Sequence, residues 1–137
     1  MSTERRIARR GRLFTIAYAH DREGNCPGEQ FFNQLSMADK AKLMKLFEIL
    51  GDLGKYSNGE KFGDLGGGLY EFKSHQIRMP FAYSPHEKGL VLITHGFFKK
   101  RDKAPPAEIE RARRILAEDE NATGLRIVSR KSPKRDV

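Results

Sequence analysis

The sequence of 137 residues contains one cysteine, no tryptophan and four histidines. Cys26 has no CxxC or Cys/His neighbour at metal-ligand spacing, so neither a disulfide framework nor a structural zinc site is expected. No apolar run approaches the roughly 20 residues that span a bilayer, and the Arg-rich beginning is not followed by the apolar stretch of a secretory signal. We therefore expect a cytoplasmic protein without a cofactor, a metal or a membrane partner.

The chain length leaves room for one compact domain with short tails. No internal repeat is present. We predict a basic N-terminal arm over residues 1–11, one folded domain over residues 12–118 and a basic C-terminal tail over residues 119–137.

The net charge of +8 is unevenly distributed. Residues 1–12 and residues 126–137 each carry five cations against one carboxylate. Residues 73–103 carry seven cations against two carboxylates. Clustered Lys and Arg attract phosphate backbones, so a polyanion partner is expected. For the two ends alone, charge for solubility on disordered tails is an equally good interpretation.

The first half of the chain predicts one strand and two helices. Leu13–Tyr18 is β-branched and aromatic and predicts a strand, and Pro27 begins a short helix that ends by Ser36. Ser36 with Asp39 forms a capping signal for a second helix to about Leu53. Its apolar stripe comprises Leu43, Leu46, Phe47, Leu50 and Leu53. Its opposite face is expected to be solvated and carries Lys40, Lys42, Lys45, Glu48 and Asp52.

A Gly-rich loop, which is either a plain connector or the rim of a site, leads to a predicted hairpin. The simplest hairpin has Ser74 and His75 at its turn, although a four-residue loop gives the same pairing. This register separates apolar from polar side chains. The predicted pairs are Phe72 with Ile77, Tyr70 with Met79, Glu71 with Arg78, and Lys73 with Gln76.

The segment 89–98 is apolar on both faces and predicts a central strand. Pro80 withdraws one backbone donor from the strand before it, which indicates an edge or a bulge there. Pro105 and Pro106 begin a last helix with a core-facing stripe of Ile109, Ala112 and Leu116. After Asp119 the pattern fades, and a loosely ordered end is expected.

This order of elements resembles the RelE/ParE toxin superfamily, in particular its phage-derived, HigB-like branch. The similar segments are AYAHDREGNCPGEQFFNQL, GGLYEFKSHQIRMPFAY and VLITHGFFKKRDKAPPAEIERARRI. The resemblance implies an α+β, RelE-like single domain in the order β-α-α-β-β-β-α, with a small curved and mainly antiparallel sheet. It also implies a type II toxin that cleaves mRNA, usually on the ribosome, and that is restrained by a cognate antitoxin.

The chain departs from the pattern of this family at three places. Lys73 stands where an Arg is frequent, which keeps the cation but removes two-point phosphate binding. Pro80 interrupts a strand, and the basic segment after Asp119 is additional.

RNA cleavage without a metal requires an activated 2′-hydroxyl, stabilised charge on the phosphoryl oxygens and a proton for the leaving oxygen. We predict Arg78, Lys73, His95 and Lys99 as catalytic residues. Arg78 is the first choice for charge stabilisation, and its alternative role is a cross-strand pair with Glu71. Lys73 supplies a second phosphate contact or transfers a proton, or else is an exposed structural lysine.

His95 has two interpretations that the sequence does not separate. In one strand register it lies opposite Arg78 on the polar face and is a candidate acid–base group. In the register one residue away it lies opposite Met79 in the core.

The residues after the last strand are predicted to bind substrate. Lys100, Arg101 and Lys103 are expected to contact RNA phosphates, and Phe98 is expected to stack on a base. Core packing is the alternative for such a phenylalanine.

The interpretation that this sequence favours is a ribosome-dependent mRNA endonuclease toxin. A ParE-like gyrase poison and a phage-derived nucleic-acid-binding protein without activity are the alternatives. A titratable group among the cations favours the nuclease, because a protein that only binds needs positive charge alone.

Overall fold

The computed structural model describes residues 5–54, 59–100 and 105–135, with residues 123–135 described as helix backbone only. Seven strands form one sheet in the order β1-β2-β6-β5-β4-β3, with β7 beside β5. Within the described residues β2 and β6 are parallel, and the other pairs are antiparallel. The strands are β1 (Arg6–Arg10), β2 (Thr15–Tyr18), β3 (Phe62–Gly66), β4 (Leu69–Ser74), β5 (Ile77–Tyr83), β6 (Leu90–Ile93) and β7 (Phe97–Phe98).

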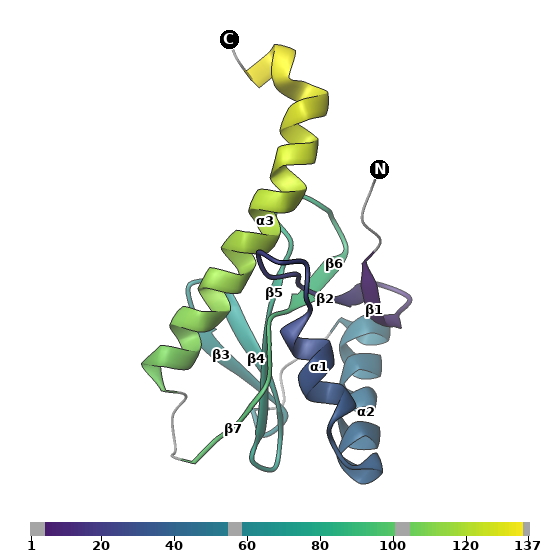
Figure 1. Ribbon diagram of the computed structural model, residues 1–137. Helices are drawn as coiled ribbons and strands as arrows, with labels where there is room; N and C mark the ends of the chain where they lie inside the picture. Colours follow the sequence, from purple (N-terminus) through teal and green to yellow (C-terminus); the bar gives the residue numbers. More distant parts are fainter. Residues whose placement is uncertain (1–4, 55–58, 101–104, 136–137) are drawn as a thin grey trace.

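Helices lie on both faces of the sheet (Figure 1). Helices α1 (Pro27–Asn33) and α2 (Met37–Leu53) pack on one face, and α3 (Pro106–Arg135) crosses the other. The predicted α+β class with a mainly antiparallel sheet is therefore confirmed. No helix in the described part of the chain is both long enough and apolar enough to span a bilayer.

Helix α2 begins and ends where its sequence predicts. The Ser36 hydroxyl accepts a hydrogen bond from the backbone N–H of Asp39, and Gly54 ends the helix in the left-handed conformation. The prediction for Leu53 is wrong, because this side chain is 56% exposed. At about 100° per residue it lies at the margin of the stripe that the other four apolar residues define.

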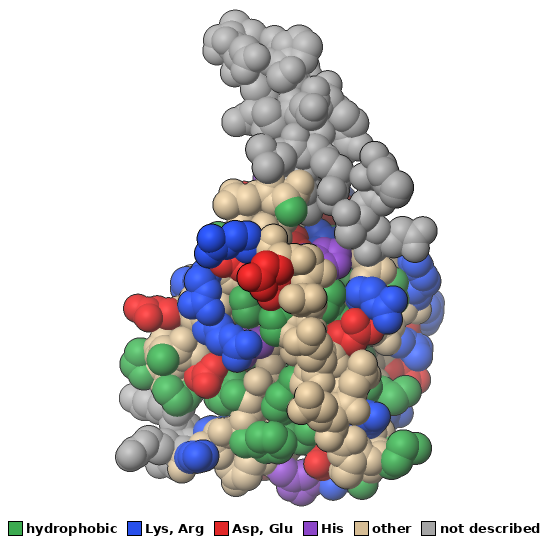
Figure 2. Space-filling view, viewed as in Figure 1, with side chains coloured by type: hydrophobic (Ala, Val, Ile, Leu, Met, Phe, Trp, Pro, Cys, Tyr) green, Lys and Arg blue, Asp and Glu red, His purple; other side chains and the backbone are tan. Residues whose placement is uncertain are grey.

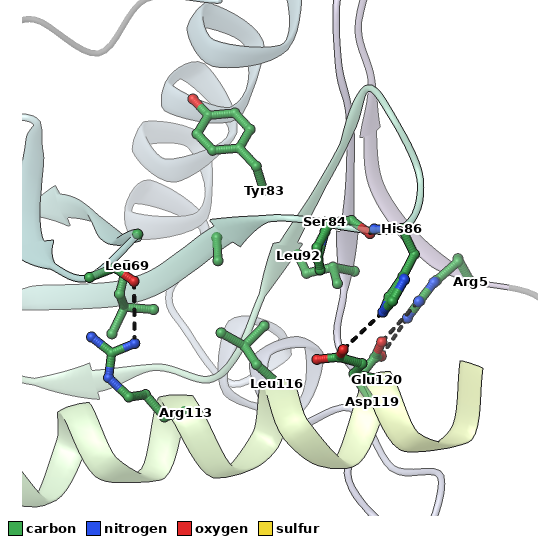
Figure 3. A pocket seen from close by; sticks show the side chains of 14 residues that line it. Arg5, Leu69, Tyr83, Ser84, His86, Leu92, Arg113, Leu116, Asp119 and Glu120 are labelled. Atoms are coloured by element: carbon green, nitrogen blue, oxygen red, sulfur yellow. Dashed lines mark hydrogen bonds and ion pairs between the residues drawn. The ribbon is translucent and has the colours of Figure 1, made fainter. Parts of the chain in front are cut away.

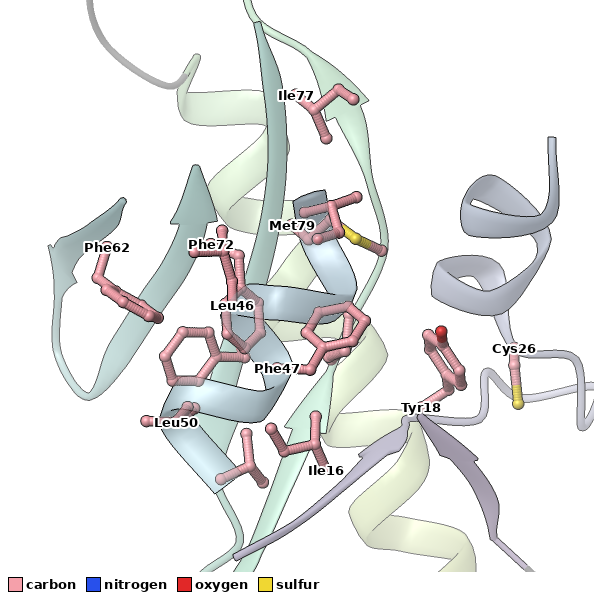
Figure 4. Close-up of a cluster of buried hydrophobic side chains, with 14 residues drawn as sticks. Ile16, Tyr18, Cys26, Leu46, Phe47, Leu50, Phe62, Phe72, Ile77 and Met79 are labelled. Atoms are coloured by element: carbon pink, nitrogen blue, oxygen red, sulfur yellow. The ribbon is translucent and has the colours of Figure 1, made fainter. Parts of the chain in front are cut away.

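The main core lies between α2 and the sheet (Figure 4). Phe72 lies at its centre, with ring centroids 5.0 Å from Phe47 and 4.4 Å from Phe81. Smaller clusters around Ala112 and Ile115 of α3 cover the opposite face of the sheet. Because both faces are covered, the central strand β6 is buried along its whole length, as its apolar sequence predicts.

Strand β1 was not predicted, because its residues were assigned to a basic arm. Two arginines of this strand and the one before it form intramolecular ion pairs: Arg6 with Glu29, Arg9 with Asp52, and Arg5 with Asp119. The turn after β1 packs on α2 at Gly11, where a Cβ atom would lie 2.3 Å from the Gly51 carbonyl carbon.

The hairpin of β4 and β5 keeps the predicted faces but not the predicted register. Its turn residues are His75 and Gln76, so Ser74 pairs with Ile77 and Lys73 pairs with Arg78. His75 has a φ of 55°, a conformation that few residues other than glycine adopt. The predicted pairs are wrong by two positions, and the side chains stay on the predicted faces because a strand repeats every two residues.

The predicted strand 89–98 is divided into β6 and β7. Between these strands, two residues of β5 lie opposite three residues, Thr94–Gly96, which form a bulge. Pro80 lies opposite this bulge, and its carbonyl accepts a hydrogen bond from the Thr94 N–H. Pro80 predicted an edge or a bulge in its own strand, and the bulge is found in the segment paired with that strand, between β6 and β7.

Helix α3 continues past Asp119, where a loosely ordered end was expected, and runs beyond the sheet (Figure 1).

Candidate functional site

Three of the four predicted catalytic residues lie together at the turn end of β4 and β5. Lys73 and Arg78 are direct neighbours across the two strands. Lys99 follows β7, and its backbone N–H donates to the Gln76 carbonyl over 2.6 Å. We call Glu71, Lys73, Arg78 and Lys99 the hairpin cluster.

Glu71 lies at the centre of this cluster and was not predicted as a site residue. It points to the same face as Lys73 two residues later. The residue is 7% exposed, and its Oε1 has no hydrogen-bond partner among the described residues. Burial raises the pKa of the Glu71 carboxyl above 4.5, although the charges of Arg78, Lys73 and Lys99 oppose that rise. A buried carboxylate with a vacant oxygen is suited to accept a proton.

Strand β3 leaves space for that carboxylate. Gly63 pairs with Glu71 across the two strands. A Cβ atom at Gly63 would lie 2.9 Å from Glu71 Oε2. The missing side chain at Gly63 therefore permits the observed position of the Glu71 carboxylate.

Arg78 is less available for substrate than the sequence predicts. The residue is 8% exposed, and its Nη1 donates to the carbonyls of His75 and Ile77 over 2.6 and 2.9 Å. Its Nε lies 3.9 Å from Glu71 Oε2, so the predicted pairing with Glu71 exists as a diagonal contact. Arg78 thus holds the turn and places a positive charge beside Glu71.

Lys73 and Lys99 are half-buried, so each ammonium group can reach solvent from a defined backbone position. Lys100 is exposed beside them. Arg101 and Lys103, the other predicted phosphate contacts, lie outside the described residues. Phe98 is 54% exposed and its ring centroid lies 5.3 Å from that of Phe31, on the α1 side of the sheet.

His95 takes the buried alternative, although in neither predicted register. The bulge places Phe97, not His95, opposite Arg78. His95 is fully buried, with Nε2 2.9 Å from Glu108 Oε1 and Nδ1 2.9 Å from Thr94 Oγ1. Burial lowers the pKa of His95 below 6.5, and the hydrogen bond to Glu108 partly opposes this. The geometry gives the ring no contact with a substrate, and it joins the bulge to α3.

A cavity of about 270 Å³ lies at the other end of the face that α3 covers (Figure 3). Leu69, Leu92 and Leu116 form its apolar part. The charged side chains at its rim are paired: Arg5 with Asp119, His86 with Glu120, and Arg113 with the Gly66 carbonyl. This cavity lacks the grouped cations of the hairpin cluster.

Within the described residues, no group of three His, Cys, Asp or Glu side chains is arranged to hold a metal ion. The hairpin cluster supplies one carboxylate and three cations, which suits binding of an anion and transfer of protons.

The sequence did not predict Glu71 as a site residue, because a cross-strand pair with Arg78 already accounted for a carboxylate at this position. One feature of the sequence could have indicated a functional role for Glu71: it is a carboxylate between Tyr70 and Phe72, in a largely buried strand. The space that its carboxylate occupies is left by Gly63 of β3, which no local pattern reveals.

Comparison with known proteins gives a matching family model and a similar solved structure. The family model described as phage-derived protein Gp49-like matches residues 30–117, more than half of the chain. The crystal structure of the isolated E. coli RelE toxin is similar with a TM-score of 0.41 and 21% identity, over 73% of this chain and 100% of that one. No curated protein sequence is significantly similar to the chain.

Proposed function

Because the chain belongs to the Gp49-like family of phage-derived proteins, which are RelE/HigB-like toxins, we propose that it is a type II toxin that cleaves mRNA on the ribosome. Family membership confirms the resemblance that the sequence carries, and the cleavage activity is our proposal. The hairpin cluster is the observation that supports it: a buried carboxylate beside three cations, at an end of the sheet that solvent reaches.

The proposed reaction is attack of a ribose 2′-hydroxyl on the adjacent phosphorus. Glu71 accepts the proton of the hydroxyl, and the new P–O2′ bond forms as the P–O5′ bond breaks. The ammonium groups of Lys73 and Lys99 neutralise the phosphoryl oxygens, and one of them gives its proton to the departing 5′-oxygen. The products are a 2′,3′-cyclic phosphate and a 5′-hydroxyl.

Arg78 acts as a positioning residue in this scheme. Its guanidinium holds the turn carbonyls and lies next to Glu71, so it keeps Glu71 and Lys73 in register. His95 has no part in the proposed reaction, because both of its ring nitrogens are hydrogen-bonded, to Thr94 and to Glu108.

The proposed partners follow from this activity. The substrate is mRNA held by the ribosome, and the protein acts in the cytoplasm. Lys100, Arg101, Lys103 and Phe98 remain the proposed RNA contacts outside the cluster. A cognate antitoxin with an acidic segment would neutralise the hairpin cluster by covering it.

Induction of the protein in bacteria tests this function. Translation, the 5′ ends of transcripts and plasmid supercoiling are measured for the wild type, Glu71→Gln and Arg78→Ala, with Lys88→Ala as the control at an exposed lysine outside the cluster. We expect rapid translation arrest with new mRNA 5′ ends for the wild type and the control. Loss of a general base lowers rates by about 10²–10⁴-fold, so Glu71→Gln should abolish arrest.

Arg78→Ala is expected to abolish toxicity as well, and circular dichroism of the purified variant checks that it is folded. Changed supercoiling with intact transcripts would identify a gyrase poison instead. An absence of any growth effect would leave a nucleic-acid-binding protein. Full toxicity of Glu71→Gln would remove Glu71 from the mechanism.

A further inference from the structure

A second basic site lies on the α2 side of the hairpin. A groove of about 400 Å³ separates α2 from the residues that lead into β3 and out of β4. Four lysines line it against a single carboxylate, that of Glu60: Lys42, Lys45, Lys61 and Lys73. We call this the lysine groove. Lys42 and Lys45, which the sequence predicts on a solvated helix face, lie beside Lys61 and Lys73, more than fifteen positions away.

The lysine groove and the hairpin cluster share a wall. Lys73 belongs to both. The turn residue His75 connects them, because its ring Nε2 accepts a hydrogen bond from Lys42 Nζ over 2.8 Å and its carbonyl accepts one from Arg78 over 2.6 Å. The Lys73 N–H donates to the Lys61 carbonyl, which fixes Lys61 against the same strand. Positive charge therefore continues from the cluster around the turn into the groove.

The lining of the groove suits a phosphate backbone. Lysine is a compact point charge that binds phosphate without regard to base identity. Lys45 lies 3.6 Å from Glu48 and is partly neutralised, so Lys42 and Lys61 are the lysines that we assign to phosphate binding. The apolar lining is limited to Leu46, which is 3% exposed, and Ile49. A groove that holds an amphipathic protein helix needs several apolar pockets at helical spacing, which are missing from this lining.

We propose that the lysine groove binds the phosphodiester backbone of the RNA strand on one side of the cleaved linkage. This proposal rests on the proposed function. A strand whose scissile phosphate lies at Lys73 continues around the His75 turn, and the next phosphates meet Lys42 and Lys61. The groove adds affinity that is independent of sequence and sensitive to salt.

RNA that cannot be cleaved, because its 2′-hydroxyls are methylated, tests binding to the lysine groove separately from cleavage. Fluorescence anisotropy compares a 2′-O-methyl 12-mer with a 2′-O-methyl 3-mer from 50 to 300 mM salt. The proteins are the wild type, the double variant Lys42→Ala/Lys61→Ala, and Lys88→Ala as the matched control. Each lost contact to a single strand reduces the slope of log K against log salt by about 0.7. We expect the slope for the 12-mer to fall by about 1.4 in the double variant, with no change for the 3-mer or the control.

A wild-type slope for the double variant with the 12-mer would overturn the proposal. An equal reduction of the slope for the 12-mer and the 3-mer would also overturn it, because the lysines would then act through the overall positive charge of the protein and not as a binding subsite. If the double variant bound RNA normally but an acidic antitoxin segment weakly, the groove would be a protein-docking site and the proposal would be wrong.

Failure of the proposed function has a different signature. If Glu71→Gln kept full cleavage while the double variant lost the 12-mer slope, the catalytic assignment would fall and the groove would stand. If Glu71→Gln lost cleavage while the double variant bound the 12-mer normally, the groove alone would be overturned.

Discussion

At the scale of single residues, Gly63 decides where the Glu71 carboxylate lies. We predict that Gly63→Ala displaces this carboxylate, because the new Cβ would lie 2.9 Å from Glu71 Oε2. Cleavage should fall by at least about tenfold, since small misplacements of a catalytic group are costly. Gly59→Ala is the control, because nothing lies within 4 Å of a Cβ there. Measured transcript cleavage that is equal in both variants would show that the position of Glu71 is unimportant.

The charge on Lys73 should contribute to the pH dependence of the proposed cleavage. The proposed reaction needs ionised Glu71, so its rate should rise with pH through the pKa of Glu71, which burial raises above its ordinary value. Lys73 is one of three cations that lower that pKa, so Lys73→Gln removes one opposing charge and moves the acid limb to higher pH. The pH profile of single-turnover cleavage measures this shift, even where Lys73→Gln reduces the maximum rate. An acid limb at unchanged or lower pH would contradict the role of Glu71 as the base.

The cations of the site were predictable from the sequence, and their carboxylate was not. Lys73 and Arg78 lie on the polar face that alternation predicts, because a register error of two positions leaves the faces unchanged. The environment of His95 depends on a bulge that inserts one residue opposite β5. An insertion of that kind reverses which side chains face the core, and a strand that is apolar on both faces gives no sign of it.

At the scale of elements, the bulge is held in place from α1. Gly96 lies so close to Phe31 that a Cβ atom would lie 2.1 Å from the ring. Gly96→Ala should therefore lower the free energy of unfolding by about 1–3 kcal/mol, the usual cost of overpacking. Urea unfolding of the variant measures this loss.

Gly59→Ala again provides the comparison and should differ from the wild type by less than about 0.5 kcal/mol. A Gly96→Ala protein with wild-type stability would mean that α1 and the bulge move apart at little cost.

Helix α2 was predicted almost to the residue, whereas β1 was missed. The α2 signals are local: a serine cap, a repeating apolar stripe and a terminal glycine. Charged residues conceal the strand character of β1, because Arg6 and Arg9 of the strand pair with Glu29 and Asp52, and Arg5 before it pairs with Asp119. Long-range ion pairs have no sequence signature, so the segment was interpreted as a free basic arm.

At the scale of the whole molecule, Asp119 of α3 binds Arg5 and His20 from the N-terminal part of the chain. Its carboxylate accepts two hydrogen bonds from the Arg5 guanidinium and one from the His20 N–H, and the residue is 2% exposed. We predict that Asp119→Asn costs about 3 kcal/mol, because it leaves a largely buried guanidinium without its counter-charge. Thermal and urea unfolding measure the loss.

The exposed pair of Arg6 and Glu29 serves as the comparison. Arg6→Ala should cost less than about 1 kcal/mol, since a solvated ion pair contributes little. Equal effects of Asp119→Asn and Arg6→Ala would indicate that the first pair is no more important than the second.

The parallel pairing of β2 with β6 has a consequence for how the protein is made. Thr15 leaves the ribosome early, but its neighbour Leu90 is synthesised much later, and β6 is the strand that joins β2 to β5 in the sheet. Contacts between such distant parts of a chain form slowly and last. A nascent polypeptide that ends before Lys99 therefore lacks one member of the hairpin cluster and, under the proposed function, is not yet a complete toxin.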